Sequence, residues 1–294
     1  MQTSIIKKIL FLLFILSVVA AAYPALGGGA GSSVQEESTL ELNALQLLQE
    51  GFREIIRKTT PVVVEVNTVQ LSGPSDISPF DLFTVPKEQM ERELLKRGLG
   101  SGVIVRKEGK KVYVLTNSHI VGNADLINVR LSDRTQHRAT LVGTDKRKDL
   151  ALVVFETEEA VLVAELGDSD SMQIGDLVFA VGNPFGFQPS VTMGVVSVLG
   201  KRATAGQGSV DVIDYIQTDA VINRDNSGGA LVNIRGEVIG INTWIASPSG
   251  GTTGLGFTIP INNAKGVIDA FITMGEVDYG WLGINAQDPL PEVK

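Results

Sequence analysis

Three residues of the types needed for nucleophilic acyl transfer occur along the chain in the order His119, Asp149 and Ser227. Ser227 lies in Asn226-Ser-Gly-Gly229, where two glycines allow a sharp turn and leave main-chain N–H groups facing a bound carbonyl. Taken alone, a serine beside two glycines is more often an ordinary turn. Together the three residues predict a site in which a serine attacks, a histidine removes its proton and an aspartate orients the histidine.

The chain offers few bases, because it has only two histidines. His119 follows the predicted strand Val112–Leu115, where a side chain can project into a cleft. His137 stands between Arg134 and Arg138, and neighbouring cations disfavour the imidazolium that a general base must form. We interpret His137 as structural. Asp149 immediately precedes an apolar strand and could orient an imidazole, although such a carboxylate alone is more often a strand-edge charge.

Composition excludes several other classes of protein. The chain has 294 residues, 44% of them hydrophobic, and a formal net charge of -8, so nucleic-acid binding is disfavoured. It has no cysteine, which excludes disulfides, thiolate zinc sites and cysteine nucleophiles. With only two histidines, a multi-histidine metal site is disfavoured as well. We therefore expect neither a metal nor a cofactor.

Short β-rich segments separated by Gly, Asn and Asp turns predict an all-β protein of barrels or a sandwich. The predicted strands are residues 62–66, 102–105, 112–115, 151–155, 177–181, 195–199 and 237–241. Residues 71–98 are predicted to form a long loop. A last helix is expected over Ala264–Met274, with Asn263 as its cap and Gly275 as its stop.

The N-terminal segment has the pattern of an export signal. Lys7 and Lys8 precede an uncharged apolar run from Ile9 to about Ala22, followed by small residues, as in a secretory signal peptide. The alternative is an uncleaved signal anchor that extends to Leu26. In both cases the two lysines stay on the cytoplasmic side and the rest of the chain is translocated.

The next segment is predicted to be a tether and a short helix. Residues 27–35 are rich in Gly and Ser and read as flexible. Ser38–Glu41 matches a capping box, and apolar residues then recur at helical spacing until Pro61. These residues are Leu45, Leu48, Phe52, Ile55 and Ile56.

From about residue 50 to 275 the chain resembles the protease domain of the HtrA (DegP/DegS) family. The matching segments are TNSHIVGNAD (116–125), DKRKDLALV (145–153), GDLVFAVGNPFGF (175–187), VTMGVVSVLGKR (191–202), IQTDAVINRDNSGGALVNIRGEVIGINT (216–243) and GLGFTIPINNA (254–264). The chain order His119, Asp149, Ser227 is also that of the double-barrel serine proteases.

This resemblance implies a chymotrypsin/trypsin-like fold of two six-stranded β-barrels, with a short N-terminal helix and a C-terminal helix. The expected organisation is a signal peptide or anchor (1–26), a tether and helix (27–60), an N-terminal barrel (61–160), a C-terminal barrel with its closing helix (161–278) and the truncated start of a PDZ domain (279–294). It also implies a periplasmic or envelope location, a homotrimer held by N-terminal protease-domain residues, and protein quality control or regulated cleavage of unfolded substrates.

The resemblance assigns roles to individual residues. His119 is implied as general base, Asp149 as its orienter and Ser227 as nucleophile. The oxyanion hole is implied in the segment Asp225, Asn226 and Ser227, with the N–H groups of 225 and 227 as donors. Val221, six residues before the nucleophile, is implied as the base of a pocket for small or aliphatic side chains, between the loops 182–189 and 244–251. The other pocket residues are Ile222, Asn223, Asn242, Thr243 and Trp244.

One departure from the family concerns Asp225, which stands where the family usually has Gly. That Gly commonly has a positive φ, and a strained backbone costs on the order of 1 to 3 kcal/mol. Loss of one oxyanion donor costs about 2.7 to 4 kcal/mol. The sequence therefore predicts an enzyme of low basal turnover. The alternative hypothesis is a catalytically silent family member that binds unfolded segments. A third hypothesis is an envelope protein with only a structural role.

The second departure lies at the end of the chain. Tyr279–Gly283 resembles the opening of the PDZ domain that follows the protease in this family, yet the chain stops at Lys294. About a dozen residues are too few to fold as a domain. We do not read Gly254–Phe257 as a PDZ carboxylate loop, because it precedes Thr258–Pro260 as the last strand of the protease does. Residues 182–186 lack the Lys-Ser/Thr ending of a phosphate loop.

Overall fold

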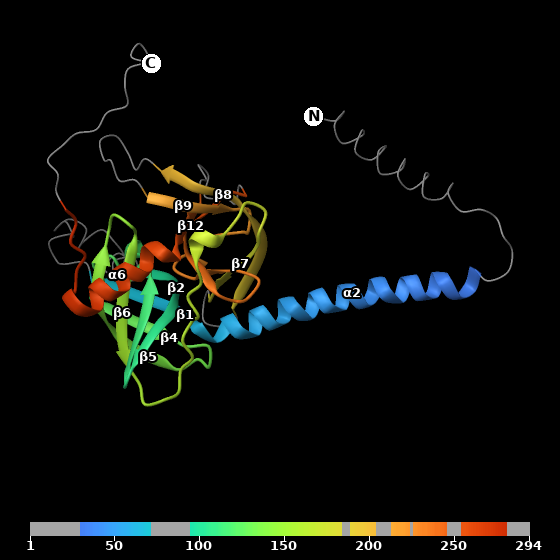
Figure 1. Ribbon diagram of the computed structural model, residues 1–294. Helices are drawn as coiled ribbons and strands as arrows, with labels where there is room; N and C mark the ends of the chain where they lie inside the picture. The colour runs from blue at the N-terminus through green and yellow to red at the C-terminus, as the bar shows by residue number, and fades with distance from the viewer. Residues whose placement is uncertain are drawn as a thin grey trace, which may run out of the picture. The chain divides into compact units, whose positions relative to one another are not determined.

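Two closed six-stranded antiparallel barrels form the body of the protein (Figure 1). The computed structural model describes residues 30–71, 95–183, 189–203, 213–223, 226–245 and 254–280. The predicted signal segment, Asp225 and the expected PDZ start lie outside the described part of the chain, which leaves out residues 1–29, 72–94, 184–188, 204–212, 224–225, 246–253 and 281–294. Within it, the all-β, trypsin-like architecture expected from the sequence is confirmed.

The first barrel has the strand order β1-β2-β3-β6-β5-β4. Its strands are β1 (Val63–Leu71), β2 (Leu95–Glu108), β3 (Lys111–Thr116), β4 (Leu126–Arg130), β5 (Gln136–Asp145) and β6 (Leu150–Glu156). Closure of the barrel leaves no unpaired edge, and one face of every strand points inward. The interior is accordingly apolar, and includes Val64, Val66, Ile104, Val114 and Val153.

The second barrel has the strand order β10-β11-β12-β9-β8-β7. Its strands are β7 (Leu177–Gly182), β8 (Ser190–Ala203), β9 (Ile213–Thr218), β10 (Ala230–Val232), β11 (Val238–Ile245) and β12 (Gly256–Pro260). Its interior includes Val178, Ala180, Ile216, Leu231 and Ile239. A third apolar cluster contains residues of both barrels and therefore joins them into one unit.

The C-terminal helix α6 (Ile261–Met274) covers the junction of the two barrels, since it contacts β5 and β6 of the first and β11 and β12 of the second (Figure 1). It ends, as predicted, at Gly275, which has a φ of 80°. The expectation that Asn263 caps it is wrong. The helix begins at Ile261, directly after β12, and the N–H of Asn262 donates instead to Oγ of Ser169 at 3.2 Å.

The N-terminal helix α2 (Ala30–Thr59) is longer than predicted. It includes residues 30–35, which were expected in the tether, because no proline interrupts the helical segment before Pro61. A short 3-10 turn, η1 (Thr60–Val62), then leads into β1. Among the residues that the structure describes, no helix is both long and apolar enough to cross a membrane.

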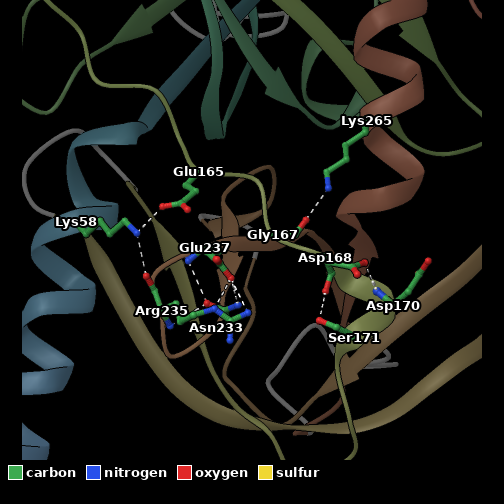
Figure 2. Close-up of polar contacts among 10 residues, drawn as sticks. All are labelled: Lys58, Glu165, Gly167, Asp168, Asp170, Ser171, Asn233, Arg235, Glu237 and Lys265. Atoms are coloured by element: carbon green, nitrogen blue, oxygen red, sulfur yellow. Dashed lines mark hydrogen bonds and ion pairs between the residues drawn. The ribbon is translucent and has the colours of Figure 1, made fainter.

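The last turns of α2 are fixed to the second barrel. The ring of Phe52 meets that of Phe179 edge-on at a centroid distance of 5.3 Å. A polar contact lies further along the same helix. Figure 2 shows Lys58, whose Nζ lies 2.7 Å from the Glu165 carboxylate and 3.0 Å from the main-chain oxygen of Arg235. The segment 51–59 is therefore held by both an apolar and an ionic contact.

Candidate active site

Asp149 lies in the tight turn between β5 and β6. Its φ is +53°, in the left-handed region that Asp and Asn tolerate better than most residues. The main-chain oxygen of Asp149 accepts hydrogen bonds from the N–H of Ser118 at 3.2 Å and from Nδ2 of Asn117 at 3.0 Å. The turn is thus clamped to the segment that carries His119.

The Asp149 carboxylate is surrounded by donors from two parts of the chain. Nδ1 of His119 lies 2.8 Å from Oδ2 and 3.0 Å from Oδ1. The main-chain N–H of His119 donates to Oδ1 at 3.1 Å, and the Ser118 hydroxyl donates to the same oxygen at 2.9 Å. From β11, the Thr243 hydroxyl donates to Oδ2 at 2.6 Å. The imidazole of His119 is therefore oriented through Nδ1, which leaves Nε2 to act as a base.

Burial and hydrogen bonding act on this carboxyl in opposite directions. Burial raises the pKa of Asp149, whereas the hydrogen bonds from His119 and Thr243 and the attraction of a charged imidazole lower it. The lowering effects prevail, and the pKa of Asp149 lies below its ordinary value. The carboxylate consequently stays ionised at neutral pH and can stabilise an imidazolium at His119.

Ser227 is 4% exposed and follows Asn226 at the start of a tight turn before β10. Its hydroxyl oxygen lies 2.9 Å from the main-chain oxygen of Thr243 and 3.3 Å from that of Asn223. Within the described part of the chain, no hydrogen bond joins the Ser227 hydroxyl to His119. Thr243 therefore links the two halves of the site, because its oxygen accepts from Ser227 while its hydroxyl donates to Asp149.

Close packing fixes the backbone around Ser227. Gly228 has a φ of 80°, and a Cβ there would lie 2.1 Å from the main-chain oxygen of Ser101. A Cβ on Gly182 would lie 2.4 Å from Cβ of Asn226. The N–H of Ser101 donates to the main-chain oxygen of Ser227 at 2.8 Å, so the first barrel also holds the serine loop.

The segment implied as the oxyanion hole is only partly described, since Asp225 lies outside the described residues. The N–H of Asn226 donates to the main-chain oxygen of Asn223 at 3.2 Å. The Asn226 side chain accepts from the N–H of Asn223 at 2.9 Å and donates to the oxygen of Val221 at 3.0 Å. The N–H and the side chain of Asn226 thus hold the loop together rather than facing a substrate.

The predicted pocket residues differ in accessibility. Val221 is 40% exposed, and its main-chain oxygen accepts from the Thr192 hydroxyl at 2.8 Å. Asn223 is also exposed, whereas Ile222 is buried. Asn242 is buried too, and its Nδ2 donates to the oxygen of Ala230 at 3.1 Å. The side chain of Trp244 lies outside the described part of the chain.

The turn that carries Asp149 has a second contact, with residues that follow α6. The guanidinium of Arg147 lies over the ring of Tyr279, 4.4 Å from its centroid, and the Tyr279 hydroxyl bonds to the Asp145 carboxylate. The sequence resemblance assigned Tyr279 to the start of another domain, and it included Asp145 and Arg147 in a matching segment without predicting their contact with Tyr279. Ser118 was also missed, although its place directly before His119 was a usable signal.

Comparison with known proteins identifies the family. Residues 100–241 match the family described as "Trypsin-like peptidase domain". The solved structure of the HtrA-type protease AlgW with a tripeptide is 37% identical and superposes with a TM-score of 0.68, covering 82% of this chain and 70% of that one. The chain belongs to the HtrA family of trypsin-like serine proteases. AlgW with a decapeptide gives 38% identity and a TM-score of 0.65, over 81% of this chain and 73% of that one.

Two curated HtrA relatives are named as periplasmic enzymes. The probable periplasmic serine protease do/HhoA-like of Haemophilus influenzae is 41% identical over 251 residues, which are 80% of this chain and 53% of the relative. The periplasmic serine endoprotease DegP of Escherichia coli K12 is 47% identical over 186 residues, 63% of this chain and 38% of DegP. The chain thus spans about half, or less, of the length of these HtrA relatives.

Proposed function

We propose that this chain is an exported serine endopeptidase that cleaves unfolded or misfolded proteins after small or aliphatic residues. In the proposed reaction, Oγ of Ser227 attacks the scissile carbonyl carbon while Nε2 of His119 accepts the hydroxyl proton. The same proton then passes to the leaving amine as the C–N bond breaks, and water releases the acyl group by the same steps. Asp149 stays ionised and stabilises the imidazolium throughout.

The observation that carries this proposal is the chain of hydrogen bonds from His119 through Asp149 to Thr243 and Ser227. Thr243 bonds directly to Asp149 of the first barrel and to Ser227 of the second, and His119 joins this chain through Asp149. Acyl transfer requires such a nucleophile and base, with the base oriented by a third group.

The preference for small or aliphatic side chains rests on Val221. An exposed apolar residue at the base of the pocket cannot pair with the cation of Lys or Arg, so a basic side chain would lose its hydration without compensation. A peptide series that varies only the residue before the scissile bond tests this point. We expect Val, Ala or Ile to be cleaved and Lys to be refused, and preferred cleavage after Lys contradicts the assignment.

Low basal activity is the second part of the proposal. The Ser227 hydroxyl donates to Thr243 and not to His119, and Asp225 replaces the glycine usual in HtrA proteases. A non-glycine residue forced to positive φ costs on the order of 1 to 3 kcal/mol, enough to favour a resting arrangement of the loop. We expect Asp225→Gly to raise kcat/KM for a peptide by about tenfold or more. An unchanged rate sinks this part of the proposal.

The same orientation of Ser227 favours one alternative, a silent HtrA protein that binds unfolded segments without cutting them. A fluorophosphonate probe separates the two functions, because it reacts only with a serine that a neighbouring base can activate. If the chain is a protease, we expect the probe to label the wild type and not Ser227→Ala. We also expect the unlabelled wild type to cleave casein, and Ser227→Ala not to cleave it. A silent binder would remain unlabelled and still suppress the aggregation of an unfolded protein.

Export and assembly complete the proposal. Residues 1–26 direct the chain to the periplasm or cell envelope, the location named for the HtrA relatives, and cell fractionation tests this. We also propose a homotrimer assembled through the N-terminal part of the protease. Leu42, Leu45 and Leu48 of α2 are more than half exposed, which leaves apolar surface for neighbouring copies. Light scattering of the wild type should give three times the mass of one chain. The double variant Leu45→Glu, Leu48→Glu should give the mass of one chain.

A further inference from the structure

The Ser118 hydroxyl reaches the catalytic carboxylate directly, with Oγ 2.9 Å from Oδ1 of Asp149. Ser118 is the first residue of the short helix α5 (Ser118–Val121) and immediately precedes His119. It belongs neither to the three residues that carry the reaction nor to the pocket. Its side chain nevertheless contacts the group that orients the base.

The main chain holds Ser118 in place on both sides. Its N–H donates to the main-chain oxygen of Asp149 at 3.2 Å, and its own oxygen accepts from the N–H of Gly122 at 2.8 Å. Ser118 therefore binds Asp149 through backbone and side chain at once. A hydroxyl whose backbone is fixed in this way loses little further entropy when it donates.

The donors around Asp149 are divided between its two oxygens. Oδ2 receives the Thr243 hydroxyl and the shorter contact from the imidazole, whereas Oδ1 receives the Ser118 hydroxyl and the N–H of His119. A carboxylate offers about four lone-pair sites, so these four donors fill it. Without Ser118, Oδ1 would keep one main-chain donor and the longer imidazole contact of 3.0 Å.

Other polar groups beside the turn are directed elsewhere. Nδ2 of Asn117 donates to the main-chain oxygen of Asp149 and not to its carboxylate. Nζ of Lys148 lies 3.4 Å from the main-chain oxygen of Asn263. Among the described residues, therefore, neither neighbour stands ready to replace the Ser118 hydroxyl on Oδ1.

We propose that Ser118 is a positioning residue, whose hydroxyl holds the Asp149 carboxylate at the angle at which Oδ2 meets Nδ1 of His119. This role rests on the proposed proteolysis, since it acts on the base of that reaction. Because the Ser118 hydroxyl acts through Asp149 and not on the substrate, its removal should lower kcat and leave KM unchanged. A carboxylate free to rotate would orient the imidazole for a smaller fraction of the time.

Paired substitutions of equal shape test this role. Ser118→Thr keeps a hydroxyl, whereas Ser118→Val has the same branched shape without one, so any steric cost is common to both. We expect the Val variant to lose about tenfold in kcat relative to the Thr variant, with equal KM, as for one hydrogen bond to a charged group. Equal kcat values in the two variants would overturn the proposal. Ser171→Ala, which removes an exposed hydroxyl bonded to the oxygen of Asp168, serves as the control and should keep the wild-type rate.

A second measurement does not depend on catalysis. With only two histidines in the chain, the imidazole Nδ1 proton of His119 can be followed by NMR and assigned by its loss in His119→Ala. We expect a sharp low-field signal in the wild type and the Thr variant, and faster exchange with water in the Val variant. Identical signals contradict the role of Ser118. Faster exchange in the Val variant supports the role of Ser118 even if the wild type neither cleaves peptide nor reacts with fluorophosphonate, a result that would refute the proposed protease alone.

Discussion

Ser227 donates its hydroxyl proton to the main-chain oxygen of Thr243, across a distance of 2.9 Å. A serine hydroxyl has one proton, so in this arrangement it does not donate to the imidazole of His119. In the proposed reaction, the Ser227 side chain must turn from Thr243 toward His119 before its proton can pass to Nε2. The hydroxyl of the same threonine remains on Asp149, so the contact between Asp149 and His119 is kept while the Ser227 side chain turns.

The first prediction concerns the Thr243 hydroxyl. Thr243→Val keeps the shape and the main-chain oxygen but removes the donor to Oδ2 of Asp149. We expect kcat/KM to fall about tenfold, the effect of one hydrogen bond to a charged group, while Thr243→Ser stays within about threefold of wild type. Steady-state cleavage of a fluorogenic peptide measures both. Should Thr243→Ser lose as much as Thr243→Val, the shape of the side chain and not its hydroxyl is what matters.

The second prediction concerns Gly182, whose backbone lies against the serine loop. A Cβ at this position would lie 2.4 Å from Cβ and 2.6 Å from Cα of Asn226, so the residue before Ser227 must move. We expect Gly182→Ala to lower kcat/KM about a hundredfold and to destabilise the fold by about 1 to 3 kcal/mol. Peptide cleavage and urea unfolding measure the two effects.

Gly266 provides the matched control for this substitution. It lies within α6 and has nothing within 4 Å of the Cβ position. Alanine favours a helix interior over glycine by roughly 0.5 to 1 kcal/mol, so Gly266→Ala should stabilise the protein and leave activity unchanged. Equal effects of the two substitutions would show that the contact with Asn226 has no influence on the site.

The third prediction follows from the lowered pKa of Asp149. An ionised carboxylate of this kind contributes stability that is complete above its unfolded pKa of about 3.9 and is lost as the pH falls through the lower folded value. We compare wild type with Asp149→Asn, which tolerates the same positive φ. The free energy of unfolding should differ by about 1 to 2 kcal/mol at pH 7 in favour of wild type. The difference should shrink below about pH 4, and urea titrations at several pH values measure it. A difference in the free energy of unfolding that does not change with pH would mean that ionisation of Asp149 does not stabilise the fold.

Some elements of the fold were open to prediction because their residues alternate or run continuously apolar. All seven predicted strands lie within or overlap observed ones, as β6 (Leu150–Glu156) does with its mostly buried residues. The strands β4, β5, β9 and β10 were missed, and β12 was expected only from the family resemblance, as the last strand of the protease. In β5 the exposed and buried residues do not alternate regularly, because Thr140 and the apolar Leu141 are both exposed and the register shifts between Leu141 and Gly143. Because the exterior of a barrel accepts both polar and apolar side chains, the alternation of polar and apolar residues that marks a strand is lost here.

The site was predictable in its residue types but not in its connections. The order of His119, Asp149 and Ser227 was visible in the sequence, and Thr243 was expected only as a pocket residue. Its contact with Asp149 joins β11 to a turn of the other barrel, 94 residues away. No local pattern specifies such a pairing, because the closure of two barrels decides which residues meet. The orientation of the Ser227 hydroxyl likewise depends on packing and not on the sequence around it.

The contact of Tyr279 with Arg147 and Asp145 has a mechanical consequence. The turn that carries Asp149 is also where the chain that leaves α6 is held, and only one residue, Lys148, separates Arg147 from Asp149. A pull on the chain after Tyr279 would therefore act on the end of β5, through Asp145, and on the turn that follows it, through Arg147. Tension at the end of the chain would thus be transmitted to within two residues of Asp149, the proposed partner of His119.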